Sequence, residues 1–242
     1  MKQLPFKHLV RGLLLSTIAA SCQAGSIELS PVRVNLSRTV KVAVLTVRNT
    51  GAEESVMQVT LNKWALDGLA YSYTRSQELV VTPATFRLQP GAQQLVRIGL
   101  RGSAPQAREA AYRLLVEEVP PPPTAGVTQM RMVVRHDLPV FVAPVAAAKP
   151  ALDISVECAS DGARLRVTNI GNVHAQLRNL ALDSGANSTT FGRWDTFDYL
   201  LPSAQKSWGL AQVAPGAVNK NFRLTALTDQ GSFAADVKNN CS

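Results

Sequence analysis

Side chains able to perform acid–base or metal chemistry are sparse in this chain. After residue 24 there are two histidines, His136 and His174, and two cysteines, Cys158 and Cys241. Asp137 follows His136 like a fragment of a proton relay, but adjacent residues on a strand point to opposite faces and do not align as base and orienting acid. No zinc-ligand spacing, GxSxG elbow, phosphate loop or GxGxxG motif is present. The sequence therefore predicts no enzyme, no metal site and no cofactor.

Three tryptophans, Trp64, Trp194 and Trp208, are the remaining candidates for a small-ligand site. Aromatic rings of this kind could line a sugar site. Isolated tryptophans in β-sandwiches belong more often to the core, and we prefer that interpretation.

The first 24 residues have the order of a secretory signal peptide. Three basic residues precede the apolar run Gly12–Ala20, and small residues then lead to Ala24. Cleavage after Ala24 is expected. The alternative is a lipoprotein signal at Cys22, for which Ala19 is a poor substitute for the usual leucine.

The charge balance does not indicate a nucleic-acid partner. Lys and Arg number 25 against 17 Asp and Glu, a formal net charge of +8, but the basic residues are scattered without a block of five. After the signal, no apolar run approaches the length of a membrane span, which is about 18 residues. We therefore expect no binding of nucleic acid and no insertion into a membrane after signal cleavage.

The two cysteines that remain after cleavage, Cys158 and Cys241, form an even pair in an exported chain. An oxidising compartment favours one disulfide between them, which we predict. The alternative is two buried free thiols.

Two regions of short apolar strands are separated by the proline-fenced segment APVAAAKP, which ends at Pro150. We expect a signal peptide at 1–24, one domain at 25–145 and a second at 150–242. Turn signals such as Asp67-Gly68 and Pro90-Gly91 separate the strands, and no segment shows a capped helical period. The expected strands are Val40–Val47, Glu78–Val81, Ala84–Leu88, Gln94–Leu100, Ala111–Val119, Val127–Val142, Arg164–Thr168 and Asn221–Ala226. This spacing predicts an all-β protein of two β-sandwiches, although two small barrels would give the same pattern.

The order of strands and turns in VVTPATFRLQPGAQQLVRIGL (Val80–Leu100), followed by REAAYRLLVEEVPP and VTQMRMVVRH, resembles the periplasmic chaperones of chaperone–usher pili. The resemblance extends from about Ile27 to Cys241. It implies two immunoglobulin-like domains set at an angle with a cleft between them. It also implies a non-enzymatic periplasmic protein whose partners are pilus (fimbrial) subunits and an outer-membrane usher.

The same resemblance implies a donor strand near the end of the first domain. Met130, Met132 and Val134 share one face of this run by period-two spacing. A strand of this kind stabilises a subunit by supplying the strand that the subunit lacks. The alternative is an ordinary interior strand, whose alternation would look identical.

A basic anchor for the subunit's C-terminal carboxylate is also implied, and Arg33 in IELSPVRVNL matches the family's first anchor. An arginine suits this role because its planar fork binds a carboxylate through two hydrogen bonds. The family's second anchor is a lysine, whose position is taken here by Pro139. Arg97 and Arg135 are therefore the candidates for the missing charge.

A second departure concerns a buried ion network between the domains. Glu109 and Asp229 match its acidic members, whereas Ala143 replaces the arginine that joins them elsewhere. We expect the two carboxylates to have lost their basic partner. This divergence resembles the archaic or spore-coat-type branch of the family.

The rival interpretation is a secreted two-domain β-sandwich adhesin or a pilus structural subunit. A pilus subunit should carry an alternating N-terminal extension before a single incomplete domain. Here the strand containing Arg33 begins shortly after the expected cleavage point, and two domains follow.

Overall fold

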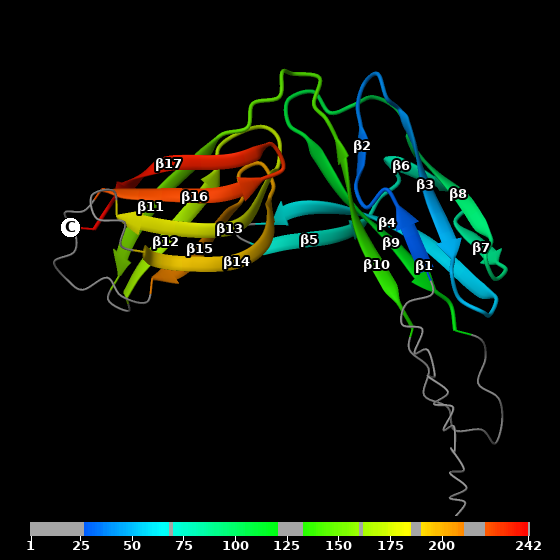
Figure 1. Cartoon of the computed structure of the whole chain (residues 1–242). Coiled ribbons are helices and arrows are strands. Elements are labelled where there is room, and N and C mark those ends of the chain that lie inside the picture. Colours follow the sequence, from blue (N-terminus) through cyan, green and yellow to red (C-terminus); the bar gives the residue numbers. More distant parts are fainter. Residues whose placement is uncertain are drawn as a thin grey trace, which may run out of the picture.

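The computed structural model describes residues 27–67, 70–120, 133–159, 162–184, 190–210 and 221–241, so the expected signal peptide lies outside this part of the chain. Every regular element in these ranges is a β-strand (Figure 1), as the sequence predicts. Within the same ranges, no helix has the length and apolar character of a membrane span.

The first sandwich is built from two sheets that enclose one core. A four-stranded sheet has the order β1-β3-β8-β6, and a six-stranded sheet has the order β2-β10-β9-β4-β5 with β7 paired to β4. Leu45 and Ile98 from the first sheet share a buried cluster with Met57, Leu114 and Val140 from the second. The strands are β1 (Ile27–Ser30), β2 (Val34–Leu36), β3 (Val42–Asn49), β4 (Ser55–Asp67), β5 (Ala70–Arg75), β6 (Leu79–Thr82), β7 (Thr85–Leu88), β8 (Gln93–Leu100), β9 (Ala110–Glu118) and β10 (Arg135–Val142).

The second sandwich is a single seven-stranded sheet folded over on itself, with the order β14-β13-β16-β17-β11-β12-β15. Leu165 on β12 and Leu182 on β13 lie far apart in this order but belong to one buried cluster. Phe222, Leu224 and Ala226 alternate into that cluster, as the sequence predicts. The strands are β11 (Leu152–Ala159), β12 (Gly162–Asn169), β13 (Ala175–Ser184), β14 (Thr190–Leu200), β15 (Gln205–Leu210), β16 (Phe222–Thr228) and β17 (Gly231–Asn239).

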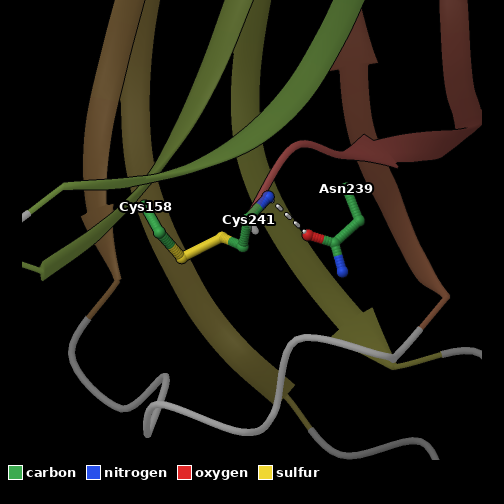
Figure 2. The surroundings of a disulfide bond; sticks show 3 residues. All are labelled: Cys158, Asn239 and Cys241. Atoms are coloured by element: carbon green, nitrogen blue, oxygen red, sulfur yellow. Dashed lines mark hydrogen bonds between the residues drawn. A yellow bond between two sulfur atoms is a disulfide. The ribbon is translucent and has the colours of Figure 1, made fainter.

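A disulfide closes the far end of the second sandwich. Cys158 on β11 is bonded to Cys241, which follows β17, and the amide of Cys241 donates to the side chain of Asn239 (Figure 2). The predicted disulfide is therefore confirmed. It joins the first and last strands of this sandwich, which also pair directly through Ser155 and Lys238.

Each sandwich contains a buried asparagine at the end of one strand, Asn49 after VR and Asn169 after VT. Asn49 Oδ1 accepts from the amide of Gly51 at 2.8 Å, and its Nδ2 donates to the carbonyls of Glu53 and Leu88.

Asn169 repeats the arrangement with the amide of Gly171 at 2.9 Å and the carbonyls of Val173 and Leu200. The matching turns read LQPGA (88–92) and LLPSA (200–204). The same device therefore satisfies the buried backbone groups at one turn of each sandwich.

The two sandwiches are set at an angle, and the β4–β5 hairpin extends from the first towards the second (Figure 1). Trp64 on β4 is buried in the core cluster of the second sandwich. Tyr71 on β5 donates its hydroxyl hydrogen to the carbonyl of Tyr199 on β14 at 2.6 Å. Apolar and polar contacts of the hairpin thus fix the position of one sandwich against the other.

Candidate functional site

One face of the sheet containing β10 is turned towards the second sandwich. Leu138 and Val140 belong to the core of the first sandwich, so the alternate residues Pro139 and Phe141 lie on the opposite face. Phe141 is buried in the cluster of the second sandwich. We call this side of the sheet the inner face.

Two arginines flank Pro139 on the inner face. Arg113 on β9 is the pairing partner of Pro139. On the other side of β10, Val34 pairs with Val140, so Arg33 occupies the position beside Pro139, one residue earlier on each strand. Neighbouring strands lie about 4.8 Å apart, which places the two arginine backbones roughly 10 Å from each other across the proline. The register therefore sets two cations on either side of one small apolar residue.

Arg113 is held in place by an aromatic ring and a carboxylate. Its guanidinium carbon lies 3.8 Å from the ring centroid of Trp64, and one of its nitrogens lies 3.6 Å from Asp137. A stacked guanidinium keeps its charge and much of its hydrogen-bonding capacity. Its Nε is buried and makes no hydrogen bond within the described part of the chain.

Tyr199 on β14 is the residue of the second sandwich that packs next to these arginines. Its ring centroid lies 5.8 Å from that of Trp64 and 5.7 Å from that of Phe141. Burial raises the pKa of the Tyr199 hydroxyl, while the charges of Arg33 and Arg113 act in the opposite direction. The guanidinium carbon of Arg113 lies 5.8 Å from the centroid of the Tyr199 ring.

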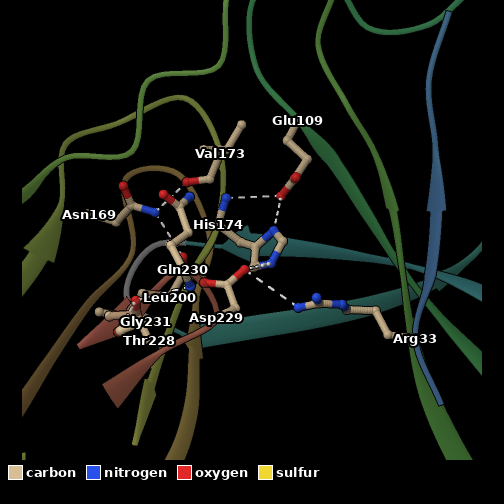
Figure 3. Close-up of polar contacts among 10 residues, drawn as sticks. All are labelled: Arg33, Glu109, Asn169, Val173, His174, Leu200, Thr228, Asp229, Gln230 and Gly231. Carbon is tan, nitrogen blue, oxygen red and sulfur yellow. Dashed lines mark hydrogen bonds and ion pairs between the residues drawn. The ribbon is translucent and has the colours of Figure 1, made fainter. Parts of the chain in front are cut away.

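Next to Arg33, a polar network crosses between the sandwiches (Figure 3). Glu109 Oε1 accepts from the backbone amide of His174 at 3.0 Å and lies 2.7 Å from its Nδ1. The other ring nitrogen, Nε2, is 3.5 Å from Asp229 Oδ2, and the same oxygen is 3.5 Å from Arg33 Nη1. The order is therefore Glu109, His174, Asp229 and Arg33, with both end residues in the first sandwich.

This network corrects one expectation from the sequence. Glu109 and Asp229 have not lost their basic partner, because His174 lies between them and Arg33 contacts Asp229. His174 was missed because these four residues come from distant segments with no common spacing. The signal in the sequence was a pair of carboxylates, Glu109 and Asp229, that had no matched basic partner, in a chain with two histidines after its expected signal peptide.

The ionisable groups of the network shift each other's pKa values. Burial acts to lower the pKa of His174, but the nearby carboxylates of Asp229 and Glu109 outweigh this and raise the pKa above its usual value of 6.5. The neighbouring His174 ring, together with the charge of Arg33, outweighs desolvation and lowers the pKa of Asp229 below 3.8. The charged forms of both residues are thus mutually stabilised.

A pocket of about 310 Å³ borders this network on the side of the second sandwich. His174 and Asp229 are among its polar lining residues, and Leu152 and Phe233 contribute apolar surface. In the described ranges, no group of three or more His, Cys, Asp or Glu side chains is arranged to hold a metal ion.

The other predicted anchors do not lie beside Arg33. Arg97 on β8 is exposed between the core residues Val96 and Ile98, so it points outward from the other sheet of the first sandwich. Arg135 is on the inner face but pairs with Glu117, about 13 Å along β10 from Pro139. It lies 3.8 Å from the carboxylate of Glu117.

The predicted donor residues are only partly covered by the structure. Met130 and Met132 lie outside the described residues. Val134 is described just before β10, and its carbonyl accepts from the amide of Glu118 at 3.3 Å. Of the three tryptophans, Trp64 is buried and Trp194 packs near Trp208 with ring centroids 6.3 Å apart.

Two all-β sandwiches joined at an angle by an aromatic and ionic contact define a two-domain protein of the immunoglobulin-like class. Residues 26–148 match the family described as "Pili and flagellar-assembly chaperone, PapD N-terminal domain". The chain belongs to this family. No curated protein matches it by sequence.

Solved structures of pilus chaperones share the whole fold. The chaperone–tip subunit complex CsuC–CsuE of the archaic Csu pili of Acinetobacter baumannii gives a TM-score of 0.67 at 21% identity, covering 88% of this chain and 99% of that chain. The YadV chaperone gives 0.64 at 19% identity, with 88% and 100% covered. The SafB chaperone, in complex with the SafA pilin of Salmonella enterica, gives 0.62 at 21% identity, with 88% and 97% covered. The prediction of two immunoglobulin-like sandwiches in a pilus-chaperone fold is therefore confirmed.

Proposed function

We propose that this protein is a periplasmic chaperone that captures pilus subunits by donor-strand complementation and delivers them to an outer-membrane usher. Family membership supports the chaperone role and favours it over a secreted adhesin or a structural subunit. The structural observation that carries the proposal is the pair Arg33 and Arg113 on either side of Pro139.

In this proposal, the two arginines bind the C-terminal carboxylate of the subunit above Pro139. A carboxylate has two oxygens and can accept from two guanidinium groups at once. Proline at the central position adds no competing donor and no long side chain, and because it is itself buried, the terminal group would bind to the two guanidinium groups rather than to the ring. Arg113 thus supplies the second cation, in place of Arg97 or Arg135.

The open edge of β10 supports the donor-strand role. β10 pairs with β9 from Arg135 to Val142, but it pairs with β2 only from Val140 to Val142. In the described part of the chain, no strand pairs with the other edge of Arg135–Pro139. An unpaired edge presents backbone donors and acceptors to a partner that lacks a strand.

The proposed donor residues continue the alternation of β10. Val134 has the same parity as Leu138 and Val140, which point to the core of the first sandwich. Met132 and Met130 follow with the same spacing in the sequence. Flexible methionine side chains fill irregular apolar grooves well, so these three residues are proposed to enter the open core of the subunit.

The direct test is to isolate the tagged protein from a periplasmic extract and to sequence what co-purifies. The proposal expects a small β-sandwich protein that lacks one strand and that aggregates or is degraded when the chaperone is absent. A subunit that accumulates in soluble form without this protein would contradict the proposal.

A further inference from the structure

His174 is a polar link between the two sandwiches. It precedes β13 in the second sandwich, yet both its backbone amide and its Nδ1 contact the carboxylate of Glu109 in the first. Its ring is stacked on Phe141 of the first sandwich, with centroids 3.6 Å apart and planes inclined by only 8°. The side chain is only 9% exposed, so water contributes little to its solvation.

Both ring nitrogens of His174 face carboxylates. Glu109 lies at Nδ1 and Asp229 at Nε2. A neutral imidazole carries one N–H and can donate to one of them only, and its second nitrogen then presents a lone pair to an anion. A protonated imidazole has two N–H groups and can donate to both. In the structure Nδ1 lies at hydrogen-bond distance from Glu109, whereas Nε2 makes no hydrogen bond among the described residues and lies 3.5 Å from Asp229, an ion-pair distance. Two carboxylates on opposite sides of the ring favour its charged form.

The remaining groups around the ring do not cancel this preference. Arg33 is the cation that approaches from the first sandwich, and it contacts Asp229 rather than the imidazole. Tyr199 on β14 lies 5.7 Å away, centroid to centroid, and Phe141 carries no charge. Two carboxylates, one guanidinium and one imidazolium form a neutral set, whereas loss of the imidazole proton leaves a net negative charge in a buried place.

We infer that His174 is a proton-dependent tie between the two sandwiches, which holds them together while its ring is charged and loosens when the ring loses its proton. This role goes beyond the proposed binding of subunits, because it concerns how the protein's two halves are held together.

The sign of the effect follows from the raised pKa of His174. A raised pKa in the folded state means that the stabilisation is fully present below the usual value of 6.5 and is lost as the pH rises through the folded-state pKa. The joint should therefore be tightest below pH 6.5 and weaker above the folded-state pKa of His174.

The test combines a titration with a local measurement on the full-length folded protein. NMR titration of the imidazole signals gives the pKa of His174 directly, and a value above 6.5 is expected. The amide of His174 is hydrogen-bonded across the joint to Glu109. Its hydrogen-exchange protection, corrected for the intrinsic rate, should decrease as the pH rises through that pKa.

Two glutamine variants separate this role from a general structural one. His136→Gln on β10 serves as the matched control, because His136 lies in the first sandwich and makes no contact with Glu109 or Asp229 among the described residues. The wild type and this control should lose about 2–4 °C in Tm as the pH rises through the pKa, which is the scale for one interaction in a chain of this length. His174→Gln should show a flat Tm over the same range.

A measured pKa at or below 6.5 for His174 in the wild type would overturn the inference, even if His174→Gln fails to fold. The same holds if His174→Gln and wild type show parallel dependence of Tm on pH, or if amide protection at His174 does not change with pH.

Discussion

Arg113 on β9 and Pro139 on β10 are pairing partners on the face of the sheet that is turned towards the second sandwich. Its guanidinium stacks on the ring of Trp64, with the guanidinium carbon 3.8 Å from the ring centroid. In the proposed function, Arg113 carries the second charge one strand away from Pro139, the position that the resemblance assigns to the family's lysine.

The first prediction concerns this pair of arginines. Arg113→Ala and Arg33→Ala should each weaken subunit binding by about 10- to 100-fold, because each removes a charge-assisted hydrogen bond to a carboxylate. Arg135→Ala, on the same face but paired with Glu117, is the control and should bind nearly normally. Binding is measured by co-purification of subunit with each variant after its thermal midpoint has been checked. Equal losses in all three variants would contradict the assignment of Arg113.

The second prediction tests the donor strand at Val134, the proposed donor residue that the structure describes. Val134→Asp should reduce recovery of soluble subunit, since a carboxylate placed in an apolar groove costs several kcal/mol that backbone pairing does not offset. Val133→Asp is the control, because the side chain of Val133 points to the opposite face from that of Val134 and is exposed. Both variants are compared in one co-expression assay. The donor assignment fails if Val133→Asp is the more harmful of the two.

The third prediction concerns the matching turns of the two sandwiches. Gly91 and Ser203 both have positive φ, 74° and 68°. Gly91→Ala should destabilise the protein by about 1–2 kcal/mol, although no atom would clash with the new methyl group, because L-residues are strained there.

The comparison for Gly91→Ala is Gly209→Ala on β15, where space is equally open and φ is not positive. That substitution should leave stability unchanged or slightly raised. Ser203→Gly relieves the same strain but removes the hydrogen bond from Arg108 at 2.9 Å, so we expect a gain of less than about 1 kcal/mol. Denaturant unfolding of the three variants measures these differences.

The fourth prediction concerns acid stability. The lowered pKa of Asp229 means that its contribution to stability is present above pH 3.8 and is lost as the pH falls through its folded-state pKa. Asp229→Asn should therefore flatten the acid side of a plot of Tm against pH. Asp236→Asn is the matched control, because that carboxylate is 89% exposed and bonded only to the exposed Arg223 among described residues. An acid limb equally steep in Asp229→Asn and wild type would contradict this account.

Strands with uninterrupted alternation could be predicted from the sequence, and β4 could not. β4 buries Met57, Val59 and Leu61 in the first sandwich and then Trp64 in the cluster of the second. The buried positions therefore change from odd to even within one strand, since its end leaves one core for another. A period-two search cannot follow such a change.

Three of the four residues of the polar network could be indicated from the sequence. Arg33, Glu109 and Asp229 were named by resemblance, whereas His174, and Arg113 outside the network, became visible once the sheet register and the contact between sandwiches were known. A cation supplied by an adjacent strand, or by the other domain, can occupy the same place in space. It does not occupy the same position in an aligned sequence motif. Arg97 and Arg135 stay predictions from the sequence for the second charge, and Arg113 is the candidate that the sheet register adds.

The hairpin β4–β5 makes the two halves of the chain inseparable as folding modules. Trp64 and Phe141 are core residues of the second sandwich although the first sandwich supplies them, and Tyr71 is bonded to Tyr199. If the chain were divided between β10 and β11, the core of the second sandwich would lose the side chains of Trp64 and Phe141. In the isolated first sandwich these aromatic rings would be exposed to water. A relative's half could replace either half only if it preserved the contacts of this hairpin and of Phe141 with the second sandwich.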